Sequence, residues 1–114
     1  MKEIIKKISR ISNRLENTAD NVLNLSSGNA SRDAALYRSM ITDIKDNMIP
    51  EALGLCSSNN VDIKEALENV GKNLNEADTM LLRINECMSQ STIRCISNSI
   101  KENANKLKKI VAFL

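Results

Sequence analysis

Apolar residues recur at alternating intervals of three and four along most of this chain, the spacing that places side chains on one face of an α-helix. A helix of many turns is not stable in water unless other structure covers its apolar face. The longest series therefore predicts a central helix over residues 61–88 that packs against similar helices. This series extends for more than three heptads, through Ile63, Leu67, Val70, Leu74, Ala77, Leu81, Ile84 and Met88.

Three other stretches show the same periodicity and predict helices over residues 2–26, 31–56 and 92–113. Their apolar stripes are aliphatic, since aromatic residues make up only 2% of the chain and cannot fill a core. Each stripe needs a partner, and the four stripes together can cover one another. The core is therefore expected at the centre of four helices, with Leu67, Leu74 and Leu81 almost fully buried.

Residues that begin, end or disturb helices separate these stretches. Gly28 stands where a helix C-cap is expected, and Ser31 is a candidate N-cap for the second helix. Pro50 lacks a backbone N–H and disfavours helical geometry at Ile49, which predicts a kink or restart in the second helix. Asp62 and Glu65 have the spacing of a capping box and predict a firm start for the central helix.

Four helices joined by short loops predict an all-α fold, an up-down-up-down antiparallel four-helix bundle with heptad-like packing and a second helix kinked at Pro50. A chain of 114 residues is long enough for one hydrophobic core, so residues 1–114 are expected to form a single domain. Gly71 lies inside the central helix, where it costs about 1 kcal/mol relative to Ala. Either a close helix crossing or a tolerated surface position explains it.

The residue types needed for most helical-bundle chemistry are missing. The chain has no His, which excludes a histidine phosphorelay domain and a di-iron site built from Glu-x-x-His pairs. Its glycines form no phosphate-binding loop, and its three cysteines do not have metal-ligand spacing. We therefore expect no enzyme activity, with no catalytic, cofactor-binding or metal residues, no cofactor and no small-molecule substrate.

The cysteines leave two interpretations open. Cys87 and Cys95 flank the turn between the third and fourth predicted helices, where they could form a disulfide if their side chains face one another. Alternatively, they and Cys56 are reduced thiols that act as small apolar side chains. No apolar run is long enough to cross a membrane, and no signal peptide is visible. A native Met1 therefore predicts a cytoplasmic protein, and secretion is the alternative if Met1 is not native.

Charge is strongly segregated along the chain. Residues 1–14 carry a net charge of +4 and residues 101–114 carry +3, although the whole chain is only +2. In an up-down-up-down bundle these two segments meet at one end, which we call the basic pole. Its nine bases are Lys2, Lys6, Lys7, Arg10, Arg14, Lys101, Lys106, Lys108 and Lys109.

Two kinds of partner can compensate this charge. The first is internal, because five acids are expected at the same end: Asp46, Glu51, Asp62, Glu65 and Glu68. The second is external: an acidic protein, a nucleic acid backbone or an anionic membrane. The shortage of aromatic residues for stacking and the modest net charge weaken the case for nucleic acid.

The sequence therefore predicts a small non-enzymatic protein that acts through protein–protein interaction, of the adaptor, chaperone, inhibitor or immunity type. Its partner is expected to be another protein or a second copy of itself. The alternative is a binder of an anionic surface, nucleic acid or membrane, through the basic pole.

Overall fold

The stretches with apolar periodicity form helices in the computed structural model. The structure describes residues 2–25, 30–84 and 89–113. The helices are α1 (Lys2–Leu23), α2 (Ala30–Asp43), α3 (Ile49–Gly54), α4 (Val61–Leu82) and α5 (Gln90–Ala112). A π-helical turn, η1 (Ile44–Met48), joins α2 to α3 without a break. The described residues thus form four helical segments and no strand, which confirms the all-α prediction and is consistent with a helical bundle.

A single cluster of buried apolar side chains includes residues from all of these helices. The stripe of α4 lies at its centre, and Leu67, Leu74 and Leu81 are no more than 1% exposed, as predicted. No aromatic side chain among the described residues is fully buried, and Tyr37 packs only partly against the cluster. The core is therefore aliphatic.

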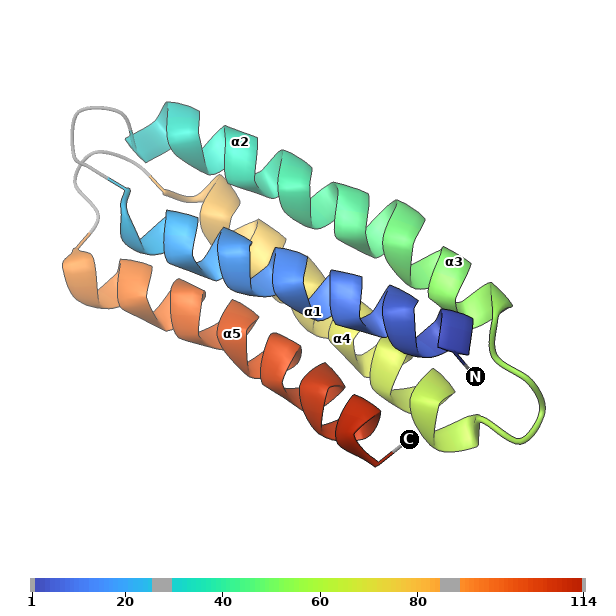
Figure 1. Cartoon of the computed structure of the whole chain (residues 1–114). Coiled ribbons are helices and arrows are strands. Elements are labelled where there is room, and N and C mark those ends of the chain that lie inside the picture. Colours follow the sequence, from blue (N-terminus) through green and yellow to red (C-terminus); the bar gives the residue numbers. More distant parts are fainter. Residues whose placement is uncertain (1, 26–29, 85–88, 114) are drawn as a thin grey trace.

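The first and last helices, α1 and α5, share the most extensive contact between any two helices described. Small side chains allow their backbones to approach closely. The buried Ser97 hydroxyl on α5 donates a hydrogen bond of 2.8 Å to the backbone oxygen of Ala19 on α1. Figure 1 shows the N-terminal end of α1 and the C-terminal end of α5 at the same end of the molecule.

Pro50 does not interrupt the second helical segment. Ile49 has helical backbone angles and is only 4% exposed, although the proline that follows disfavours this geometry. The π-turn explains why, because the N–H of Ile49 bonds to the oxygen of Ile44 five residues earlier. Residues five apart would point about 140° away from each other in a regular α-helix, whereas the wider turn lets both Ile44 and Ile49 face the core. A bend of the helix axis at this point stays a prediction.

Several predicted helix boundaries are wrong. The central helix, α4, ends at Leu82 rather than residue 88, although Ile84 beyond it is still buried. Ser31 lies inside α2 and is not its N-cap, because the helix begins at Ala30. Gly28 and Met88 lie outside the described residues.

The predicted capping box at the start of α4 is wrong as well. The helix begins at Val61 with Asn60 as its cap residue, so Asp62 lies in the first turn rather than at the cap. Asn60 holds the cap position, but its side-chain oxygen accepts hydrogen bonds of 2.9 Å from the backbone N–H and the hydroxyl of Ser57. The side chain thus closes the preceding loop instead of capping the helix.

Replacing Leu74 by Ala should lower the free energy of unfolding by about 2–5 kcal/mol, because the side chain is fully buried and leaves a cavity. Leu82→Ala is the matched control on the same helix, where the side chain is 61% exposed and the expected loss is within about 0.5 kcal/mol. Chemical denaturation of both variants measures the difference. A loss below about 0.5 kcal/mol for Leu74→Ala would show that the α4 stripe is not the core.

Gly71→Ala should stabilise the protein by about 0.5–1 kcal/mol, because Ala favours the helix and restricts the unfolded chain. The added methyl group has room, since its nearest neighbour outside its own helix would be the Ile49 Cδ1 atom at 4.0 Å. A close helix crossing is therefore not the reason for this glycine. A lower midpoint in chemical denaturation would contradict this expectation and mean that the methyl group crowds Ile49.

Candidate functional site

The nine predicted bases of the basic pole lie on α1 and α5. Five of them are on α1 and four are on α5. The pole is less compact than predicted. Arg14 lies past the midpoint of α1 and Lys101 lies at the midpoint of α5, so neither is at the end where the two termini meet. Lys2 and Lys6 lie near the start of α1, and the remaining α5 bases, Lys106, Lys108 and Lys109, occupy its last two turns.

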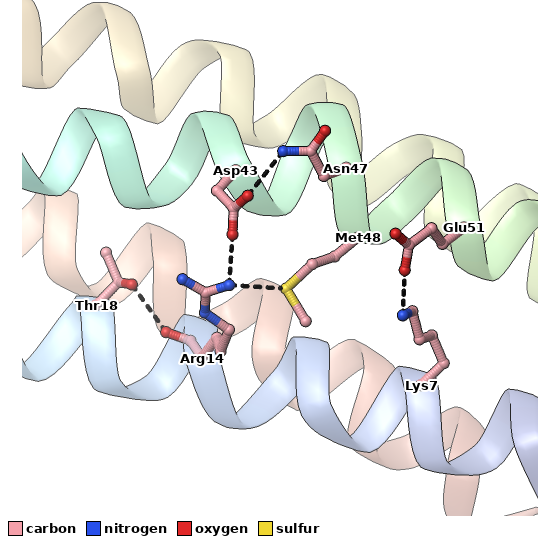
Figure 2. Close-up of polar contacts among 7 residues, drawn as sticks. All are labelled: Lys7, Arg14, Thr18, Asp43, Asn47, Met48 and Glu51. Atoms are coloured by element: carbon pink, nitrogen blue, oxygen red, sulfur yellow. Dashed lines mark hydrogen bonds and ion pairs between the residues drawn. The ribbon is translucent and has the colours of Figure 1, made fainter.

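Three of the nine bases form ion pairs with acids among the described residues. Lys7 pairs with Glu51 of α3, as Figure 2 shows. Arg14 pairs with Asp43, and Lys108 pairs with Glu16 across the α1–α5 contact. Of the five acids predicted as internal partners, only Glu51 forms an ion pair with a described base, whereas Asp43 and Glu16 were not foreseen.

The Arg14–Asp43 pair belongs to a local network that joins α1 to the π-turn (Figure 2). Asn47 of η1 donates a hydrogen bond of 2.7 Å to Asp43, and the Arg14 guanidinium also contacts the sulfur of Met48 at 3.4 Å. The hydrogen bond from Asn47 and that from Arg14 lower the pKa of the Asp43 carboxyl. This network accounts for Arg14 within the fold and gives it a structural role.

Three exposed bases stand one helical turn apart along α1: Lys2, Lys6 and Arg10, which we call the basic row. None of them forms an ion pair with a described residue. Neighbours four residues apart repel one another, and cations near a helix N-terminus oppose the helix dipole. The row therefore brings like charges together, and none of the acids among the described residues forms an ion pair with it.

A groove of about 690 Å³ runs between the basic row and α3. Its charged lining combines three bases of α1 with acids from α1 and α3. Leu55, just past α3, is 44% exposed in the same groove, although the sequence predicted helix as far as residue 56. The side chains that line the groove include Glu3, Lys6, Lys7, Arg10, Glu51 and Leu55.

The described residues offer little for catalysis. No group of three or more Cys, Asp or Glu side chains within residues 2–25, 30–84 and 89–113 is placed to hold a metal ion. Cys56 is half-buried, and its burial raises the pKa of its thiol, which disfavours the nucleophilic thiolate. Cys95 is exposed, and Cys87, with which a disulfide was one of the two interpretations, lies outside the described part.

None of the helices described has both the length and the apolar character needed to span a bilayer. What the groove offers chemically is a pair of exposed cations, Lys6 and Arg10, next to an exposed apolar side chain, Leu55. This combination suits an anionic group attached to an apolar one.

Asp43→Asn should lower the melting temperature near neutral pH, and its difference from wild type should shrink as the pH falls below 3.8, the ordinary pKa of this carboxyl. The sign follows from the lowered pKa in the folded protein. Its stabilising effect is present above the unfolded-state pKa and is lost as the pH falls through the folded-state pKa. Thermal melts of wild type and variant between pH 2 and pH 7 provide the test.

Asn47→Ala serves as the companion variant, because Asn47 is the largest cause of the lowered pKa. It should remove part of the pH dependence while leaving the carboxylate in place. An equal difference between wild type and Asp43→Asn at all pH values would contradict the assignment.

Comparison with known proteins identifies no relative of this chain: no family model matches it, and neither a curated protein nor a solved structure is significantly similar.

Proposed function

We propose that this protein is a non-enzymatic interaction protein that binds another protein through the groove between α1 and α3. The observation that supports this is the basic row. Lys2, Lys6 and Arg10 are exposed and form no ion pair with a described residue, and Lys2 also lies in the first turn, where the helix dipole disfavours a cation. A cost in stability of this kind is expected where charges serve a partner rather than the fold.

The proposal includes the finer topology, an up-down-up-down bundle with a bend near Pro50. Two observations support it. The described helices form a ring of contacts in which α1 neighbours α5 and α2, while α4 neighbours α5 and α2. A π-turn and a proline, both frequent at helix bends, occur side by side in the second segment. This topology brings the start of α1 and the end of α5 to one pole.

The lining of the groove favours a protein partner over nucleic acid or a membrane. Glu3 and Glu51 stand among the bases, and such mixed charge suits a partner with its own pattern of charges. A phosphate backbone or an anionic bilayer would instead be repelled by these two carboxylates. A second copy of the chain is another protein partner that the groove could accept.

An anionic surface is the second candidate, because Lys106 and Lys109 are also exposed in the last two turns of α5. With the basic row, they would form a broader positive face. This alternative predicts that the α5 lysines contribute as much to binding as the bases that line the groove.

The double variant Lys6→Glu with Arg10→Glu should lose its protein partner and keep or slightly raise its melting temperature. Neither base forms an ion pair with a described residue, so reversing the two charges removes no ion pair from the described part of the fold. Affinity capture from cells of the source organism, followed by mass spectrometry, measures the partner, and a thermal melt measures stability.

Arg32→Glu with Arg94→Glu is the matched control. Both residues are exposed, both lie near the start of a helix, and the change in net charge is the same. Both helix starts lie at the end opposite the N-terminus in Figure 1. This control should retain the partner. A Lys6/Arg10 variant that melts earlier and still captures the same partner would refute the proposal.

A further inference from the structure

We infer that the groove between α1 and α3 binds an acidic segment of the partner protein, in which carboxylates alternate with a bulky apolar side chain. This inference rests on the proposed function and adds the chemistry of the partner. Carboxylates of the segment pair with Lys6 and Arg10, and its apolar side chain packs on Leu55.

The spacing of the bases sets the spacing of the acids. Lys6 and Arg10 are four residues apart on α1, which separates them by about 6 Å along the helix axis. Acids four apart on a helix have the same separation, and acids two apart on an extended chain are about 6.6 Å apart. Either kind of acidic segment can therefore meet both bases, and Lys2 extends the row by one further turn.

Lys7 contributes less to this recognition than its neighbours. It already pairs with Glu51, whose side chain is 60% exposed at the edge of the groove. Glu51 therefore neutralises one base and also repels an incoming carboxylate. Removing the charge of Glu51 should strengthen binding, a result that damage to the fold cannot produce.

The apolar part of the recognition depends on the end of α3. Leu55 is exposed there, and the preceding residue, Gly54, has no side chain. Apart from the neighbouring residues and the backbone of its own helix, a methyl group placed on Gly54 would meet no atom within 4 Å, so the space over Gly54 is open. A bulky side chain of the partner can enter this space and cover Leu55.

The shape of the groove favours a polypeptide over a small anion. Its lining side chains are all exposed or half-buried, whereas sites for small molecules enclose most of the ligand in apolar walls. A chain segment that lies along the row can contact both bases and Leu55 at once without being enclosed.

The test begins with a random peptide display library, with peptides of about 12 residues so that they span the row, selected on the immobilised full-length protein. We expect enrichment of peptides with Asp or Glu two or four positions apart and at least one Leu, Ile, Met or Phe. A fluorescein-labelled copy of the dominant peptide is then titrated with each variant, and its anisotropy gives the dissociation constant.

Four variants have distinct expected effects on that constant. Lys6→Glu with Arg10→Glu should weaken binding by about tenfold or more, and Leu55→Ala by about threefold. Glu51→Gln should tighten binding by about twofold to fivefold. Arg32→Glu with Arg94→Glu, the control, should stay within about twofold of wild type.

Two outcomes of the selection would overturn the inference: no enriched peptide, or enriched peptides without acids. Two outcomes of the titration would also overturn it: equal binding by the two double variants, or no effect of Leu55→Ala together with weaker binding by Glu51→Gln. It would also fall if duplex DNA or phosphatidylserine vesicles bound more tightly than the peptide and lost binding in the Lys6/Arg10 variant. If the peptides need Lys6 and Arg10 but are not acidic, the inference fails while the proposed function stands. Unchanged capture of the cellular partner by the Lys6/Arg10 variant would refute the proposed function itself.

Discussion

Burial of the α1 stripe against α5 is the interaction on which the rest of this structure depends. It joins the first helix to the last through small side chains and the buried Ser97–Ala19 hydrogen bond. The two remaining helical segments complete an aliphatic core around this pair. Because α1 is held on its apolar side, its opposite face is fixed in space, and the basic row faces solvent in a defined orientation.

The sequence predicted the helices well because periodic burial leaves a strong signal. In the first predicted helix, a series of apolar residues at intervals of three or four is buried, from Ile4 to Leu25. Leu67, Leu74 and Leu81 of α4 are buried as well. Helix ends were predicted less well, because each depends on a single local competition. At Asn60, the side chain bonds to the loop before it and leaves the start of α4 uncapped.

The π-turn was missed for a different reason. Its only trace in the sequence is a spacing of five between Ile44 and Ile49, which breaks the α-helical period just before Pro50. Such a break can equally mark the end of a helix. Here tertiary packing keeps the segment helical, because burial of Ile49 favours a helical backbone that the following proline disfavours.

The bases of the site were visible in the sequence, but of their ion-pair partners only Glu51 was predicted. An ion pair between distant residues depends on how far each helix is rotated about its axis, and one residue changes that angle by about 100°. Glu16 and Asp43 meet their bases only because of this rotation. The exposure of Leu55 has a different cause. Because α3 ends at Gly54, Leu55 lies just past the last helical residue.

The pairing of the first helix with the last has a consequence for biosynthesis. Ala19 and Ser97 are 78 residues apart, and a ribosome needs about 4–16 s to make that length at 5–20 residues per second. During that time the α1 stripe has been synthesised, but the surface of α5 that covers it has not. This protein therefore completes its core only after α5 has been synthesised, and until then its nascent chain carries an α1 stripe that lacks its main covering surface.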